Sequence, residues 1–297
     1  MEKNSFTLVT KKRRCWNTNK GQVNIVQFFI LALINHKSIK MKKILFILYL
    51  LPTLVFSQYG VADFIVLNDG ADSAYHELEK VWSVYHQKSV DSGEKWGWSV
   101  WKRTQRDNDN ENAAHYVVFN NFSSKEQRDK AMKNWSMNKA ISIMKSGLKG
   151  KMSSRTVDKI VKNGSALKKE VRQYELQFLD ATPFVGELKI GDKMNFSAMT
   201  QKRDDYEEYE SKVWKPLFER EILRNNFRWW AITKIAKRNE SAYKDPTHLV
   251  WNVGVENGKS FIQDDDFMSK TMRSGKMMDE YRNMSNTNEL ILVYKSN

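Results

Sequence analysis

The sequence has almost no cysteine: the single residue of this type, Cys15, lies near the N-terminus. The chain beyond residue 57 has none, so it can form no disulfide and offers no thiolate for catalysis or metal binding. A glycine-rich phosphate loop, a zinc-ligand spacing and a Ser/His/Asp arrangement are also missing from the sequence. These absences argue against nucleotide-driven and cysteine-based mechanisms and leave packing as the source of stability.

The apolar run 44–56 is too short to span a bilayer, because a span takes about 20 apolar residues and this run has 13, interrupted by Pro52. It follows two lysines, and Val55 and Ser57 stand three residues and one residue before a plausible cut. This pattern predicts a cleavable signal peptide at 41–57, with the cut near Ser57/Gln58. We therefore expect a secreted or periplasmic protein that keeps no stable membrane span after cleavage.

Residues 1–40 precede a signal that is normally N-terminal, and two explanations stay open. Either Met41 is the true start and 1–40 come from translation of an upstream stretch, or 1–40 are a disordered basic leader. Segment 1–57 holds ten Lys/Arg and one Glu, so it carries +9 of the formal charge of +14. The remaining 39 basic and 34 acidic residues leave only +5. The total charge is therefore no argument for nucleic-acid binding.

The chain from residue 58 contains an internal repeat with an offset of 132 residues. Lys80-Val81-Trp82 recurs as Lys212-Val213-Trp214, and after a one-residue insertion His115 aligns with His248. The other matched pairs are Trp98 with Trp230, Val100 with Ile232 and Lys102 with Lys234. Their order and near-constant spacing indicate two copies of one unit, which we place at 58–180 and 181–297.

Each copy is predicted to run strand, helix, strand, strand, helix, strand. Leu78, Val81, Trp82 and Tyr85 have the spacing of one helix face. The alternation at 96–100, the polar turn 107–112 and the apolar run 116–119 predict a hairpin. In the second copy we expect a helix at about 205–224, kinked or restarted at Pro216, and another at about 260–284.

A βαββαβ unit is the ferredoxin-like arrangement. Two in tandem, each with an aromatic-rich hairpin, resemble the dimeric α/β-barrel superfamily, in which two such sheets close into a barrel. The expected fold class is therefore α+β, with two tandem ferredoxin-like units forming a pseudo-dimeric α/β barrel in one chain. The resemblance implies a pocket between sheet and helices that binds small apolar molecules, haem or oxidisable aromatics.

The paired residues are the candidates for such a pocket. The two histidines can act there as a haem ligand or a general base, or can be strand-end residues that face solvent or a backbone partner. The paired tryptophans are typical of packing between helix and sheet, with ligand stacking as the alternative. The paired lysines form an anion-binding pair or snorkel at strand ends. The candidate residues are His115, His248, Trp98, Trp230, Trp82, Trp214, Lys102 and Lys234.

Segment 125–172 is strongly basic, with fourteen basic and four acidic residues and a net charge of +10. Such a surface can contact lipopolysaccharide or another anionic polymer, although a solvated helix face explains it as well. No nucleic-acid-binding motif accompanies it. We therefore expect no nucleic acid as a partner.

Three hypotheses for function follow. The first is an exported protein that binds a small apolar or aromatic ligand in a barrel pocket, without a metal or other cofactor, and acts on it as a monooxygenase does or only binds it. The second is a non-catalytic envelope or secreted protein that binds an anionic surface through 125–172. The third is a haem-handling protein with one of the two histidines as axial ligand.

Overall fold

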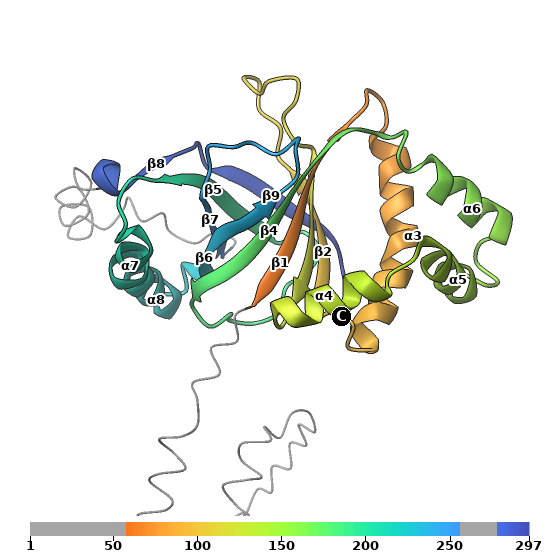
Figure 1. The fold of residues 1–297 in the computed structure, drawn as a ribbon, viewed down its shortest axis with the longest axis horizontal. Coiled ribbons are helices and arrows are strands. Elements are labelled where there is room, and N and C mark those ends of the chain that lie inside the picture. Colours follow the sequence, from red (N-terminus) through yellow and green to blue (C-terminus); the bar gives the residue numbers. More distant parts are fainter. Residues whose placement is uncertain (1–57, 256–277, 297) are drawn as a thin grey trace, which may run out of the picture. The chain divides into compact units, whose positions relative to one another are not determined.

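The computed structural model describes residues 58–255 and 278–296 (Figure 1). The predicted leader 1–40 and signal peptide 41–57 lie outside these residues, as does most of the helix predicted at 260–284. The strands are β1 (Tyr59–Leu67), β2 (Gly97–Arg103), β3 (Tyr116–Phe122), β4 (Lys168–Ala181), β5 (Lys193–Gln201), β6 (Phe227–Arg238), β7 (His248–Gly254), β8 (Arg282–Met284) and β9 (Asn288–Lys295). The helices are α3 (Asp72–Asp91), α4 (Lys125–Asn134), α5 (Met137–Gly147), α6 (Ser154–Asn163), α7 (Tyr206–Tyr209), the π-helical segment η1 (Glu210–Trp214) and α8 (Lys215–Leu223).

The strands form one closed antiparallel barrel. They are hydrogen-bonded in the order β7-β6-β4-β1-β3-β2-β9-β5, and the pairing of β5 with β7 closes this ring of eight, while β8 adds to β5. The predicted fold class, two tandem ferredoxin-like units forming a pseudo-dimeric α/β barrel, is therefore wrong. The described residues form a single eight-stranded barrel with few helices.

Continuous strand pairing explains the single barrel. The 14-residue strand β4 pairs with β1 along one edge and with β6 along the other. In the same way, β2 pairs with both β3 and β9. Every barrel strand thus has two hydrogen-bonded neighbours, so the ring presents no open edge at which it would divide into two sheets.

Both faces of the barrel wall are buried. Successive side chains of a strand point to opposite faces, and in β2 Trp101 packs in the lumen cluster whereas Trp98 and Val100 pack with residues of α3. The lumen cluster also holds Phe119 and Trp251, whose ring centroids lie 5.0 Å apart. Side chains therefore fill most of the lumen.

Helices cover the barrel on two sides (Figure 1). On one side α3 packs on the outer face through Tyr75 and Leu78, and α5 and α6 pack against α3. The helix face predicted from the spacing of Leu78, Val81 and Tyr85 is confirmed, because all three are buried. On the other side α7, η1 and α8 cover the wall.

The helix expected at about 205–224 is irregular next to Pro216 but is not broken. The range contains α7, then η1, then α8, and Pro216 lies in the first turn of α8. The backbone stays helical through Tyr209, Trp214 and Lys215, and the Lys215 N–H donates to the backbone oxygen of Glu210, five residues back. The helix therefore continues across Lys215 through a π-helical turn, a feature at which helices kink.

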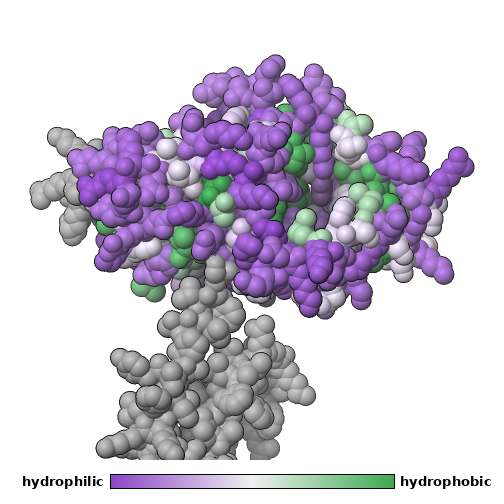
Figure 2. Space-filling view, viewed as in Figure 1, coloured by the Kyte–Doolittle hydropathy of each residue, from purple (hydrophilic) through white to green (hydrophobic). Residues whose placement is uncertain are grey.

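Hydrophilic residues cover most of the face shown in Figure 2. Within the two described ranges, no helix combines the length and the apolar character that a membrane crossing needs.

Candidate functional site

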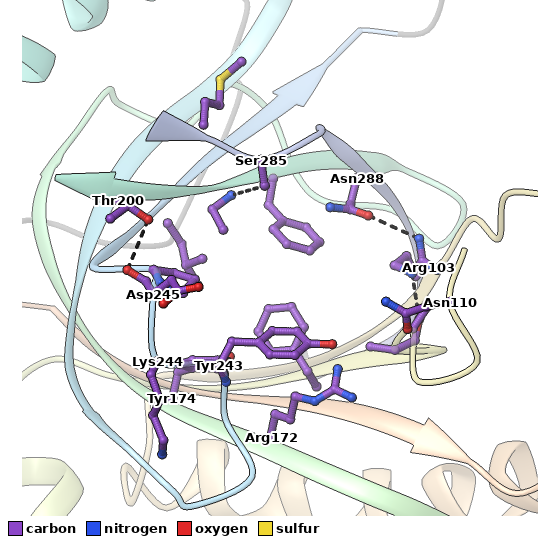
Figure 3. A pocket seen from close by; sticks show the side chains of 18 of the residues that line it. Arg103, Asn110, Arg172, Tyr174, Thr200, Tyr243, Lys244, Asp245, Ser285 and Asn288 are labelled. Atoms are coloured by element: carbon purple, nitrogen blue, oxygen red, sulfur yellow. Dashed lines mark hydrogen bonds between the residues drawn. The ribbon is translucent and has the colours of Figure 1, made fainter. Parts of the chain in front are cut away.

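A cavity of about 510 Å³ opens at one end of the barrel lumen. Loop 104–115 between β2 and β3, loop 239–247 between β6 and β7, and the turn between β8 and β9 surround it. In the close view, Arg172, Tyr174 and Tyr243 lie on one side of the cavity and Thr200, Ser285 and Asn288 lie on the other (Figure 3). Strands and loops from both halves of the chain therefore build one site.

The inner wall of the cavity is aromatic. Phe64 of β1 lies between Tyr174 of β4 and Phe196 of β5, with ring centroids 5.4 Å apart in both pairs. All three side chains are buried. In the same lumen cluster, Trp251 packs on Phe196, with ring centroids 5.3 Å apart. These rings offer an apolar surface to a flat ligand.

Two buried arginines stand beside these rings. Arg172 is directly opposite Phe64 in the ladder between β4 and β1, and only 4% of it is exposed. Its Nη2 donates to the backbone oxygen of Asn112 at 2.7 Å and to the carboxylate of Glu170. Its Cζ lies 4.4 Å from the centroid of the Tyr243 ring, so a cation–π contact holds the guanidinium in place.

Arg103 at the end of β2 is also 4% exposed. Its Nε donates to the backbone oxygen of Ala114 at 2.7 Å, its Nη1 to Asn288 at 3.2 Å and its Nη2 to the carboxylate of Asp109. The Arg103 guanidinium lowers the pKa of Asp109 below its usual range. The pair Arg103–Asp109 thus ties the β2–β3 loop to the cavity wall in ionised form.

Hydroxyl groups complete the wall. The hydroxyl oxygen of Tyr174 accepts the backbone N–H of Tyr243 at 3.0 Å. Burial raises the pKa of Tyr174, against the opposing effects of that hydrogen bond and of the Arg172 charge. The hydroxyl is therefore protonated at neutral pH, and no acceptor for its hydrogen lies among the residues the structure describes. At the opposite rim, Thr200 Oγ1 donates to the backbone oxygen of Asp245 at 3.1 Å.

None of the eight residues predicted from the repeat lines this cavity. The four tryptophans lie instead on the outer side of the barrel, packed with the helices. Trp98 is buried under α3, and its ring stacks on His86 at 4.6 Å. Trp82 packs partly buried in the same layer. Trp230 is fully buried and stacks on Phe218 at 5.8 Å, and Trp214 packs partly buried beside it.

The predicted histidines also lie outside the cavity, and the structure does not bring them together. His248 is fully buried, and its Nε2 lies 3.2 Å from the carboxylate of Glu207 in α7. Burial lowers the pKa of His248, and Glu207 opposes the shift. His115 accepts the backbone N–H of Leu67 at Nδ1, at 3.1 Å. This contact matches the alternative prediction, in which the histidine is a strand-end residue that faces a backbone partner.

The predicted lysine pair is likewise divided between two clusters. Lys102 bonds Asp72 of α3 at 2.9 Å, and Lys234 bonds Glu207 at 2.8 Å. Lys234 and His248 thus bond the same carboxylate, that of Glu207. Within the described ranges, no other two of the eight predicted residues share an acidic partner. Both lysines are about half exposed, which is the snorkelling arrangement.

The residues that line the cavity were missed because of the face chosen on each strand. The repeat singled out Trp98, Val100 and Lys102 on the outer face of β2, whereas Trp101 and Arg103 face the lumen. The sequence of β4 does carry a signal: Arg172, Tyr174 and Leu176 occupy every second position, with Gln173 and Glu175 between them. That alternation marks one face of a strand but does not say what the face encloses.

The cavity does not fit a histidine-ligated haem. Its lining includes no histidine and no cysteine, and the imidazoles of His115 and His248 are engaged outside it. Across the described residues, no group of three or more His, Cys, Asp or Glu side chains is placed to hold a metal ion. The groups that face a ligand are therefore aromatic rings, hydroxyls and guanidinium N–H donors.

Comparisons with known proteins bear on the fold. No family model matches the sequence, and the curated proteins include no match. Among solved structures, a proposed monooxygenase from Lactobacillus acidophilus NCFM has a TM-score of 0.51 at 9% identity, over 81% of this chain and 96% of that chain. A proposed monooxygenase from Fusobacterium nucleatum has a TM-score of 0.49 at 11% identity, over 81% of this chain and 94% of its own. An anthrone oxidase-like protein has a TM-score of 0.46 at 11% identity, over 80% and 92%.

At these identities the likeness concerns the fold alone. The likeness to the Lactobacillus acidophilus protein, at a TM-score of 0.51, extends to the overall fold and no further. The tandem duplication within one chain stays a prediction.

Proposed function

We propose that this protein binds a small, largely apolar molecule in the cavity at the open end of its barrel. The observation that carries the proposal is the composition of the cavity wall, where Phe64, Tyr174 and Phe196 form an aromatic surface beside two buried guanidinium groups. A pocket of a few hundred cubic ångströms with an apolar wall and a few fixed polar groups is typical of small-molecule sites. The volume of about 510 Å³ lies in this range.

A thermal-shift screen with naphthalene-sized aromatic molecules tests the proposal on the full chain. Ligand at 100 times its Kd stabilises by about 2.7 kcal/mol, which for a domain of this size raises Tm by about 5–10 °C. Ala113→Trp fills the mouth of the cavity from the β2–β3 loop, where Ala113 is part of the lining. Ala166→Trp makes the same change at an exposed turn and is the matched control.

We expect a shift in the wild type and in Ala166→Trp that is lost in Ala113→Trp. The absence of any shift across the panel would count against a binding function. An equal shift in both variants would place the site elsewhere.

Whether the protein also oxidises its ligand is a separate question. The first hypothesis from the sequence was a protein that acts as a monooxygenase without a metal or that only binds its ligand. The structural neighbour from Lactobacillus acidophilus, itself a proposed monooxygenase, supports an oxidation assay. Asp109, however, is held ionised by Arg103 with a lowered pKa, so it is a weak base. We therefore propose binding as the primary function, and oxygen uptake with each ligand that gives a shift is the test for turnover. A haem-handling role ranks lower, because it needs an axial ligand other than the two histidines.

A second candidate function is contact with an anionic lipid surface through segment 125–172. One observation favours it: Met132, Trp135 and Met137, around the junction of α4 and α5, are 57%, 42% and 41% exposed. The exposed side chains of Lys130 and Lys133 lie on the same stretch of chain. Exposed tryptophan and methionine flanked by lysines suit the interface of an anionic membrane.

Vesicle sedimentation tests this candidate, with phosphatidylcholine vesicles that contain or lack about 30% phosphatidylserine. Binding that requires phosphatidylserine, falls with added salt and is lost in Trp135→Ser supports a lipid surface. Retention on heparin without binding to either vesicle would indicate an anionic polymer instead, and no binding to any of these would remove the candidate.

We further propose export through cleavage near Ser57/Gln58. In support, β1 begins at Tyr59, so a cut there leaves the barrel intact. Mass spectrometry of the protein recovered from a secreting host tests this: a mature N-terminus near Gln58 is expected, and retention of residues 41–57 would contradict it.

A further inference from the structure

Arg172 has a hydrogen-bond donor that the protein itself does not use. Its Nε is buried and has no partner within residues 58–255 and 278–296. Its Nη2, in contrast, is engaged by Asn112 and Glu170. A buried N–H of a charged group without an acceptor costs free energy, so its persistence in a folded protein calls for an explanation. A ligand that supplies the acceptor is one.

The other cavity arginine shows that the fold can satisfy such a group. Arg103 is as buried as Arg172, yet its Nε donates to Ala114 and its two Nη atoms donate to Asn288 and Asp109. Of the two, Arg172 is therefore the one equipped to bind something else. Its guanidinium is held by the Tyr243 ring at 4.4 Å and by the two acceptors of Nη2, so little freedom is lost when a ligand binds.

We propose that the ligand is an aromatic carboxylate, with its ring on Phe64 and Tyr174 and a carboxylate oxygen on the Arg172 guanidinium. This inference rests on the proposed binding function. Phe64 is directly opposite Arg172 in the sheet, and adjacent strands lie about 4.8 Å apart. A carboxylate attached to a ring that packs on Phe64 thus comes within reach of the guanidinium. The protonated hydroxyl of Tyr174 is a second donor beside it.

The guanidinium donors of the cavity favour this class of ligand. Three cationic and two anionic side chains line it, namely Arg103, Arg172, Lys244, Asp109 and Asp245. Asp109 is engaged by Arg103, and Glu170 bonds Arg172 from outside the lining. The five lining charges sum to +1 and Glu170 brings the total to zero, so the preference rests on the guanidinium donors, whose hydrogen bonds to a carboxylate are the stronger kind.

Calorimetric titration of the full chain with 2-naphthoate and with 2-naphthamide tests the proposal, because the two probes have the same shape and differ in charge. We expect the carboxylate to bind at least about tenfold more tightly than the amide. In Arg172→Gln the ratio of the two affinities should fall to about one. Arg128→Gln is the matched control, because Arg128 Nε is also buried and unpartnered among the described residues but lies outside the cavity lining.

The outcomes separate the two proposals. Equal binding of both probes by the wild type would overturn the carboxylate assignment and leave the binding function standing. Binding of neither probe by the wild type would overturn the assignment together with the function on which it rests. The comparison of probes on the wild type decides the matter even when Arg172→Gln does not fold.

Discussion

Lys95 gives the sharpest test of the electrostatics of this fold. It precedes β2 and is 7% exposed, with its Nζ 2.6 Å from Asn120 Oδ1 and 2.9 Å from His86 Nδ1. Burial lowers the pKa of Lys95 from 10.5 to about 8, against the opposing effects of nearby carboxylates. Burial also lowers the pKa of His86 well below its usual range, so the imidazole is neutral and can accept the lysine hydrogen bond.

The sign of the effect on stability follows from proton binding. Between pH 8 and 10.5 the unfolded chain keeps the Lys95 proton while the folded protein releases it, so the free energy of unfolding rises with pH in this window. With these two pKa values, Lys95 adds about 2 kcal/mol between pH 7 and pH 9.5. Below pH 8 both states are protonated, and the dependence vanishes.

Chemical denaturation of the wild type and Lys95→Met at pH 7, 8, 9 and 9.5 measures this contribution. The difference in unfolding free energy between the two proteins should move by about 2 kcal/mol in favour of the wild type as the pH rises. Lys80→Met, at a lysine whose side chain is 62% exposed, should show no such trend. A difference that stays constant with pH would mean that Lys95 has an ordinary pKa, and the reasoning would be refuted.

Two further predictions concern the lumen and the histidines. Trp251→Ala removes a ring that is 1% exposed and whose Nε1 donates to Thr233. We expect this variant to lose about 3–5 kcal/mol of unfolding free energy, measured by chemical denaturation. The control Trp96→Ala, at a side chain that is 61% exposed, should change the unfolding free energy by less than about 0.5 kcal/mol. For any ferric haem that the protein binds, the double variant His115→Ala/His248→Ala should leave the haem absorbance spectrum unchanged, because both imidazoles are engaged elsewhere. Loss of the Soret band in the variant would show that one of these histidines is an axial ligand and would contradict this reasoning.

Local elements could be predicted because their signals are local. The spacing of Leu78, Val81 and Tyr85 gave the face of α3, the run from Trp96 gave the β2–β3 hairpin, and Pro216 gave the irregularity of the helix at 205–224. In each case the residues that carry the signal are neighbours in sequence. Propensity and periodicity act over that range.

The single closed barrel could not be predicted in the same way. Its closing pairings, β2 with β9, β4 with β6 and β5 with β7, join segments that are far apart in sequence. The position of the cavity depends on these pairings. Because helices cover the outside while side chains fill the lumen, both faces of β2 are apolar, and alternation cannot tell Trp98 from Trp101.

The pairing of His115 with His248 shows how residue identity can mislead an alignment. In the ladders, Lys102 is opposite Tyr116 and Lys234 is opposite His248. Each lysine lies fourteen residues before its ladder partner. An alignment of the two segments with a constant offset therefore needs no one-residue insertion, and it pairs His248 with Tyr116 instead of His115. Tyr116 thus stands in the same ladder position relative to Lys102 as His248 does relative to Lys234, and each bonds a carboxylate of the overlying helix, Asp72 for Tyr116 and Glu207 for His248. The two positions therefore have in common a contact with an acidic residue of the overlying helix. A tyrosine makes this contact at one position and a histidine at the other, so the structure does not require a histidine at both.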